Sequence, residues 1–194
     1  LLSGTRAIGV EMVIDGERQC FYTEAEVVLS MGAVNTPKVL MQSGIGPEDE
    51  LRTHGIALIH HLPGVGQNLQ DHIAFGCTWE YLRPQPVGGS GCETKLYWKS
   101  NSRLDAPDLL HCQLEFPVPS PAEVGIQPPQ HGWTMYAGLA RPVSRGRVRL
   151  SGAGPLDVPL IEPNSLSAPE DMAAAFASID LCRMLGNSEA FNGL

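Results

Sequence analysis

Residues 26–47 limit what this chain can fold into more than any other stretch. Residues 26–31 form a short apolar run with two adjacent valines, which is typical of a strand covered on both faces. Thr36 can cap a helix whose first residue is Pro37, and Gly44 suits the end of that helix. The sequence therefore predicts a buried strand that leads through a tight turn into a short helix.

The predicted turn is built from small residues. Gly32 and Ala33 leave room for a ligand to approach the main chain. The free N–H groups at a helix N-terminus attract anionic groups, and many cofactors bind at the carboxyl end of such a strand. An ordinary strand–helix unit that binds nothing shows the same pattern, so the residues alone leave both interpretations open.

Three blocks of the sequence resemble the glucose-methanol-choline family of FAD-dependent oxidoreductases. The first block, GAVNTPKVLMQSGIGP at residues 32–47, resembles the second signature of that family. The second is LPGVGQNLQDH at residues 62–72, and the third is RPVSRGRVRLSGAGPLDVPLIEPN at residues 141–164. The blocks follow the family order and together span most of the chain.

The resemblance implies FAD as the cofactor, and it implies which residues lie against it. From composition alone we would interpret Asp71 as a turn cap and His72 as an ordinary half-buried residue. The resemblance reverses this interpretation, because the run is placed against the flavin in those enzymes. The expected cofactor-binding residues are Gly32, Ala33, Thr36, Pro37, Asn68, Asp71 and His72.

The resemblance also suggests two substrate-binding residues. Glu93, just after the glycine turn 88–91, resembles an acidic residue at the cavity of the choline-oxidising members. There it could pair with a cationic alcohol, beside the ring face of Tyr97 or Trp98. His131 resembles a pocket histidine of the same members. The alternatives are a solvated glutamate at a strand start and a surface histidine after a proline-rich loop.

Two parts of the family pattern do not occur in this sequence. The glycine-rich dinucleotide fingerprint is missing. The family's catalytic histidine is missing too, together with the second His or Asn that accompanies it near the C-terminal end of the full-length enzymes. We therefore expect no catalytic residue in this chain. We interpret it as the middle of a longer polypeptide, which by itself neither holds FAD tightly nor turns over.

The first part of the chain carries further local signals. Strands over residues 6–13 and 19–23 are predicted around Asp15-Gly16, a favoured hairpin dipeptide. A helix is predicted between Pro47 and Gly55, followed by a strand over residues 56–61.

After residue 72 the pattern changes to short β-like segments that no helix separates, which predicts an antiparallel sheet. These segments are residues 74–82, 94–99, 109–116, 133–140 and 146–152. A helix over residues 169–185, with Ser167 as its cap, is predicted to cover the sheet. Its expected apolar stripe is Met172, Phe176, Ile179, Leu181 and Met184.

The predicted fold class is therefore α+β. Residues 1–72 form part of an FAD-binding α/β domain, and residues 73–194 form a substrate-binding domain with an antiparallel sheet and a covering helix.

Composition excludes several classes of partner. The net charge of −8 argues against nucleic acid and against anionic membranes. No apolar run approaches the roughly 20 residues that span a bilayer. Five widely spaced cysteines without a CxxC pair favour a reducing, cytoplasmic compartment. His60 and His61 point opposite ways on a strand, so no metal is expected. A homo-oligomer of the full-length protein is left open.

The expected function is FAD-dependent oxidation of a primary alcohol to an aldehyde. The same fold includes hydroxynitrile lyases, in which the flavin does no redox work, and this is the first alternative. A truncated product without catalysis is the second. The particular alcohol and the electron acceptor are not predicted.

Overall fold

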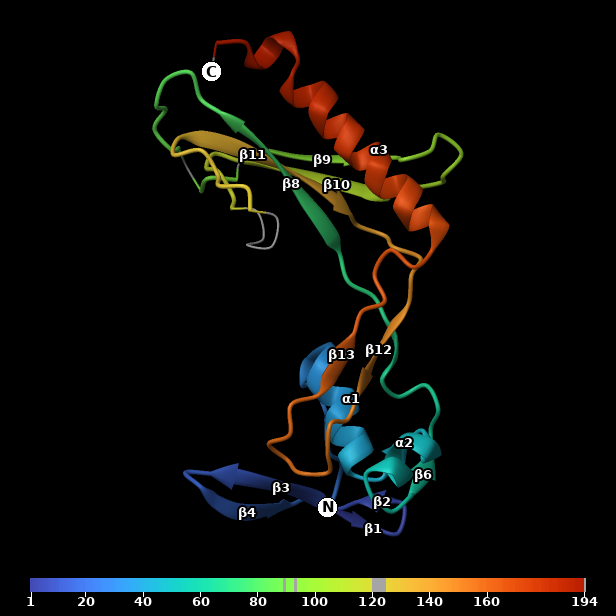
Figure 1. Cartoon of the computed structure of the whole chain (residues 1–194). Helices are drawn as coiled ribbons and strands as arrows, with labels where there is room; N and C mark the ends of the chain where they lie inside the picture. The colour runs from blue at the N-terminus through green and yellow to red at the C-terminus, as the bar shows by residue number, and fades with distance from the viewer. Residues whose placement is uncertain (89, 93, 120–124, 194) are drawn as a thin grey trace. The chain divides into compact units, whose positions relative to one another are not determined.

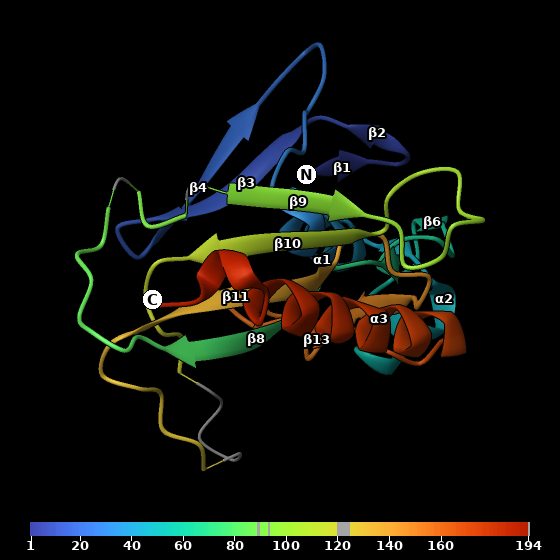
Figure 2. The same cartoon turned by 90° about the horizontal axis from the view of Figure 1, so that it is seen from above.

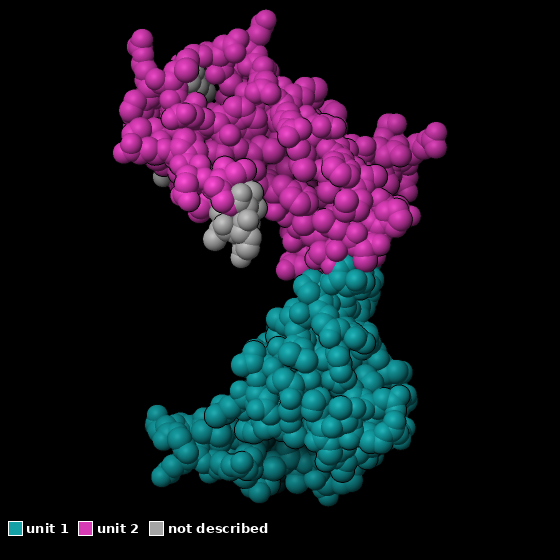
Figure 3. Space-filling view, in the orientation of Figure 1, with its two compact units in different colours: residues 1–69, 145–164 teal, residues 70–144, 165–194 magenta. Residues whose placement is uncertain are grey.

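The computed structural model describes residues 1–88, 90–92, 94–119 and 125–193. The chain folds as two compact units, coloured separately in Figure 3. Unit 1 contains residues 1–69 and 145–164, and unit 2 contains residues 70–144 and 165–194. A mixed fold of small antiparallel sheets and few helices agrees with the predicted α+β class.

Unit 1 begins with two antiparallel strand pairs. Strand β1 (Leu2–Ser3) pairs with β2 (Arg6–Ala7), and β3 (Gly9–Ile14) pairs with β4 (Glu17–Tyr22) (Figure 1). Asp15 and Gly16 both have positive φ, of 51° and 83°, as the tight turn of a twisted hairpin requires. The hairpin predicted from this dipeptide is confirmed.

The next elements of unit 1 are α1 (Gly32–Gln42), β5 (Ile45–Gly46), α2 (Glu48–Thr53) and β6 (His60–His61). Gly44 ends α1 with a φ of 84°, and a Cβ there would lie 2.6 Å from the carbonyl oxygen of Ala57. The predicted end of α1 is therefore confirmed. The predicted strand 56–61 is shorter than expected, because only its last two residues pair, in parallel, with β5.

The predicted buried strand at residues 26–31 is wrong. The structure assigns no strand there, and Val28 is 71% exposed. A parallel strand is stable only between neighbouring strands, and no strand within the described residues pairs with this segment. The start of the helix was also misplaced, because α1 begins at Gly32 and contains Pro37 in its interior.

A three-stranded antiparallel sheet completes unit 1. Its order is β13 (Leu160–Glu162), β12 (Gly146–Arg149), β7 (Gln67–Leu69). Glu50 on α2 accepts hydrogen bonds from Arg149 Nε at 3.2 Å and from the N–H of Leu150 at 2.9 Å. These pairings place residues 145–164 in unit 1, although they were expected in the substrate-binding domain that follows residue 72.

Unit 2 contains a four-stranded antiparallel sheet in the order β8-β11-β10-β9. Helix α3 (Pro169–Gly186) covers one face of this sheet, as Figures 1 and 2 show. Four of the five predicted strands are therefore confirmed, while the fifth is β12 of unit 1. Their bounds are β8 (Ile73–Glu80), β9 (Thr94–Trp98), β10 (Leu109–Leu114) and β11 (Gly132–Leu139).

Helix α3 has almost the predicted bounds, but it packs through a different face. Met172, Phe176 and Met184 of the expected apolar stripe are 39%, 61% and 63% exposed. The buried face consists mainly of small residues, because the helix lies close to the sheet. A Cβ at Gly186 would lie 2.3 Å from the indole of Trp79. The buried positions are Asp171, Ala174, Ala175, Ser178, Cys182 and Gly186.

The ends of α3 also differ from the prediction. The N-cap residue is Ala168 instead of Ser167, and its N–H donates to Ser144 Oγ at 3.0 Å. A short 3-10 helix, η2 (Glu189–Phe191), follows and stacks Phe191 on Trp133 with 4.6 Å between ring centroids. None of the helices in the described part of the chain has the length and apolar character needed to cross a bilayer.

Candidate functional site

The N-terminus of α1 is open toward solvent. Gly32 has a φ of 81°, which favours glycine, and a Cβ built there would meet no atom within 4 Å. No side chain caps the helix, and its first turn contains no acidic residue. The first N–H groups of α1 therefore remain accessible to an anionic or carbonyl ligand.

Thr36 and Pro37 shape this helix start in a way that the sequence did not predict. Thr36 Oγ1 accepts a hydrogen bond from the N–H of Met31 at 3.0 Å, so it fixes the turn before the helix and does not cap it. Pro37 has no N–H, so the carbonyl of Ala33 lacks its usual partner in the helix ladder. The first turn of α1 is held by fewer hydrogen bonds than an ordinary helical turn.

Asn68 lines a polar groove of about 540 Å³ in unit 1. Its φ of 64° lies in the left-handed region, which asparagine tolerates better than most residues. Arg147 on the same groove pairs with Glu162, with 2.5 Å between Nε and Oε2. The groove is lined by Gln67, Asn68, Arg145, Gly146, Arg147, Glu162 and Asn164.

The other two expected cofactor residues, Asp71 and His72, belong to unit 2. Both are exposed, and Asp71 Oδ1 accepts the N–H of His72 at 2.8 Å. The expected cofactor set is thus divided between the units, with Gly32, Ala33 and Asn68 in unit 1. A role for each of them against FAD stays a prediction.

A pocket of about 350 Å³ lies on the face of the unit 2 sheet opposite α3. Its wall is mostly apolar, and the residues that line it include Lys95 and Tyr136, whose side chains each carry one polar group. This composition is typical of a small-molecule site, where a few polar groups fix the orientation of the ligand. It is lined by His72, Ile73, Ala74, Cys92, Lys95, Leu110, Cys112, Leu114, Tyr136, Gly138 and Leu139.

Sequence reasoning missed Lys95 and Tyr136. Strand alternation puts Lys95 and Tyr97 on one face of β9 and Trp98 on the other, so the two aromatic rings cannot flank one ligand. Lys95 stands directly across from Cys112 in the β9–β10 register. Alternation was readable from the sequence, but the strand order that brings these residues together was not.

The two expected substrate residues have different outcomes. Glu93 lies outside the described residues. His131 is exposed just before β11, and its carbonyl accepts the N–H of Tyr81 at 3.1 Å. The nearest residue of β11 that lines the pocket is Tyr136, five residues along the strand, which at about 3.3 Å per residue lies roughly 16 Å from His131. His131 is not among the residues that line this pocket.

Glu115 holds Gly88 and Gly91 near the end of β10. Its Oε2 accepts the N–H of Gly88 at 2.6 Å, and its own N–H donates to the carbonyl of Gly91 at 2.9 Å. Burial, with the nearby charge of Glu115, raises the pKa of Tyr81.

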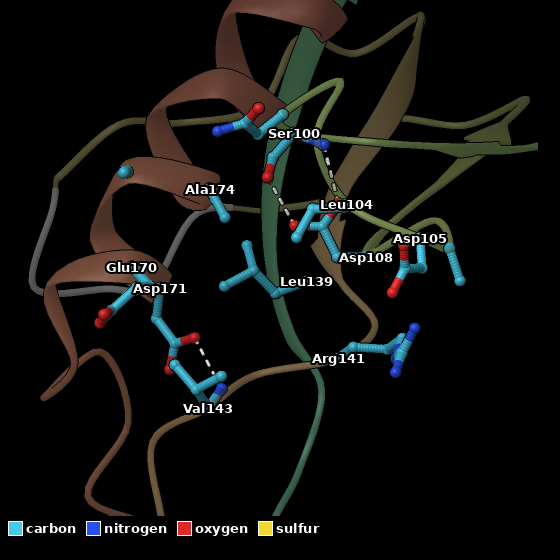
Figure 4. A pocket seen from close by; sticks show the side chains of 13 residues that line it. Ser100, Leu104, Asp105, Asp108, Leu139, Arg141, Val143, Glu170, Asp171 and Ala174 are labelled. Carbon is cyan, nitrogen blue, oxygen red and sulfur yellow. Dashed lines mark hydrogen bonds between the residues drawn. The ribbon is translucent and has the colours of Figure 1, made fainter.

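A second cavity in unit 2, of about 520 Å³, lies between α3 and the loop before β10 (Figure 4). Asp108 accepts hydrogen bonds from Ser100 N–H at 2.7 Å and from Ser100 Oγ at 2.6 Å. Asp171 accepts the N–H groups of Val143 and Ser144, each at 2.8 Å. Both carboxylates therefore hold neighbouring loops in place through hydrogen bonds. Within the described ranges no three His, Cys, Asp or Glu side chains form a metal site.

Known proteins resemble this chain over nearly its whole length. Mouse mitochondrial choline dehydrogenase is 34% identical over 98% of this chain and 36% of its own length. An alcohol dehydrogenase [acceptor] of Pseudomonas putida is 34% identical over 95% of this chain and 38% of its own. The chain therefore spans well under half the length of these curated relatives.

Solved structures give the same result for the fold. Pyridoxine 4-oxidase from Mesorbium loti superposes with a TM-score of 0.85 at 26% identity, over 99% of this chain and 38% of that one. A formate oxidase superposes with a TM-score of 0.79 at 26% identity, over 95% and 41%. The expected FAD-binding family fold is thereby confirmed.

Two family models match the first and the last part of the chain. Both are described as GMC oxidoreductase, and they match residues 1–74 and residues 142–193. FAD is the cofactor of this family, which agrees with the cofactor expected from the sequence. The chain belongs to the GMC oxidoreductase family.

Proposed function

We propose that the protein containing this chain oxidises a primary alcohol to an aldehyde, with FAD as the hydride acceptor. The observation that carries the proposal is the open N-terminus of α1, where Gly32 has positive φ and free space around it. This feature stands within the part of the chain that matches the GMC oxidoreductase model. The names of its relatives, a choline dehydrogenase and an alcohol dehydrogenase, support the choice of substrate class.

The residues of unit 1 fit an anionic dinucleotide. Gly32 and Ala33 let it approach the main chain, and the uncapped N–H groups of α1 attract a phosphate or a carbonyl oxygen. Asn68 lines a groove that also contains Arg145 and Arg147. FAD, when bound, supplies the hydride acceptor, and these groups hold it in place.

The pocket of unit 2 fits a small alcohol. Its wall is mostly apolar, and the polar groups of Tyr136 and Lys95, which both line it, can orient the hydroxyl group of the substrate. We assign no residue of this chain as the proton acceptor for the alcohol. Lys95 disfavours a cationic alcohol by charge repulsion, so we propose that a neutral alcohol is preferred over a quaternary ammonium alcohol.

Anaerobic reduction tests the proposal. The complete protein, loaded with FAD, is mixed with a series of primary alcohols without oxygen, and the flavin absorbance is followed. Bleaching that depends on alcohol concentration is expected. A flavin that stays oxidised while a cyanohydrin is cleaved would favour the lyase alternative. A protein that takes up no FAD would favour the non-catalytic one.

A further inference from the structure

The cavity between α3 and the loop before β10 has an apolar floor. Its volume of about 520 Å³ falls within the range of small-molecule sites. Leu139 of β11 and Ala174 of α3 are buried on this floor, and Leu104 of the loop is exposed at its edge. Three separate segments of unit 2 therefore build a surface that can receive an apolar group of a ligand.

Three of the four carboxylates around the cavity are not available to a ligand inside it. Asp108 accepts two hydrogen bonds from Ser100, and Asp171 accepts two backbone N–H groups. Glu170 points away from the other labelled side chains in Figure 4. Asp105 is therefore the carboxylate that can bind a ligand in this cavity.

Asp105 and Arg141 carry opposite charges at the edge of the cavity, but they do not pair with each other. Both residues are exposed, the first on the loop before β10 and the second just after β11. Figure 4 shows no hydrogen bond between either side chain and another residue that lines the cavity. A ligand that carries both charges can reach both groups, because each then gains a charge-assisted hydrogen bond.

We propose that this cavity binds a zwitterionic amino acid with an apolar side chain. The ligand carboxylate pairs with the guanidinium of Arg141, whose planar fork matches a carboxylate. The ligand ammonium pairs with Asp105, and the apolar side chain of the ligand contacts Leu104 and Leu139. Neither charged residue lines the pocket that is proposed for the alcohol, so binding does not depend on alcohol oxidation.

Saturation-transfer difference NMR of the complete protein with L-phenylalanine tests binding. The ring protons should receive saturation, and a titration should reach a plateau with a Kd on the order of 1 mM, because two charged contacts hold the ligand. Hydrocinnamate lacks the ammonium and phenethylamine lacks the carboxylate, so each should bind about tenfold or more weakly. Equal affinities for the three ligands, or a titration of L-phenylalanine that never reaches a plateau, would overturn the proposal.

Two substitutions locate the site. Arg141→Gln and Asp105→Asn each remove one charge from an exposed side chain, so neither should disturb folding. Each should lower the affinity for L-phenylalanine by about tenfold or more. Arg103→Gln is the matched control, because Arg103 is exposed on the same loop as Asp105 but does not line the cavity. The assignment is wrong if either of the first two variants binds as wild type does, or if Arg103→Gln loses as much as they do.

The ligands with a single charge distinguish direct contact from a general structural effect. Asp105→Asn should bind hydrocinnamate more tightly than wild type does, and Arg141→Gln should bind phenethylamine more tightly, because a like charge is removed in each case. A variant that only damages the structure would bind all three ligands more weakly, which would contradict the assigned contacts. Lys95→Met should leave the affinity for L-phenylalanine unchanged, and a loss there would place the amino acid in the other pocket.

Discussion

Adding a single methyl group at Gly32 separates the role of this residue in folding from its role in cofactor binding. Gly32 has a φ of 81° and nothing within 4 Å of a built Cβ. Gly32→Ala therefore meets no steric clash within the described protein, and its effect on stability comes from the backbone alone. An L-residue in this region costs about 1–2 kcal/mol.

Gly55 offers a matched control in the same unit. Its φ is 67°, a Cβ there also meets nothing within 4 Å, and it follows the C-terminus of α2 instead of the N-terminus of α1. Gly55→Ala should therefore lose about the same 1–2 kcal/mol of unfolding free energy. Urea unfolding followed by far-UV circular dichroism measures both losses.

Only Gly32→Ala should weaken FAD binding, because only there does the methyl group occupy the space that the cofactor approaches. We expect a loss of about 1.4 kcal/mol or more, which is tenfold or more in Kd. The measurement is titration of the flavin-free complete protein with FAD, followed by quenching of flavin fluorescence. Equal FAD affinities in Gly32→Ala and Gly55→Ala would refute the assignment of the cofactor to this turn.

Three further predictions concern unit 2. Gly186→Ala forces the α3 backbone away from the indole of β8 and should cost about 1–3 kcal/mol in urea unfolding, whereas Gly64→Ala, with open space around its Cβ, should be near neutral. Burial lowers the pKa of His111 in the folded state. As the pH falls, the unfolded state therefore takes up a proton at a higher pH than the folded state does, and the unfolding free energy should fall below about pH 6.5. Urea unfolding measured across this pH range should show the fall in unfolding free energy in wild type and in a His131→Gln control. If the fall persists in His111→Gln, His111 is not its cause. Lys95→Met should raise kcat/KM for choline relative to a neutral alcohol by about tenfold or more, and an unchanged ratio in steady-state assays would exclude Lys95 from the pocket's selectivity.

Local chemistry was sufficient for several elements. Asp15-Gly16 specifies a hairpin because both residues tolerate positive φ, and Gly44 ends α1 for the same reason. The span of α3 followed from the proline at its start and the glycine at its end. The family resemblance of residues 32–47 was also readable, since a long run of small residues, proline and glycine is rarely matched by chance.

Packing that depends on distant residues was not readable. The apolar residues of α3 suggested a stripe around Phe176, yet the helix buries its small residues, because Trp79 and Trp133 already fill the layer beneath it. Residues 26–31 have the composition of a strand, but a strand forms only where a neighbour supplies hydrogen bonds.

The sequence by itself determined the first hairpin turn, the C-terminal end of α1, the approximate span of α3 and the family, because each depends on preferences over a few adjacent residues. The tertiary structure decided the rest. It placed residues 145–164 in unit 1 through pairing with β7, and it brought Cys92, Lys95, Cys112 and Tyr136 to one pocket through the order of the strands. Strand order and register are set by hydrogen bonds between segments far apart in the chain, and periodicity within one segment carries no information about its partner.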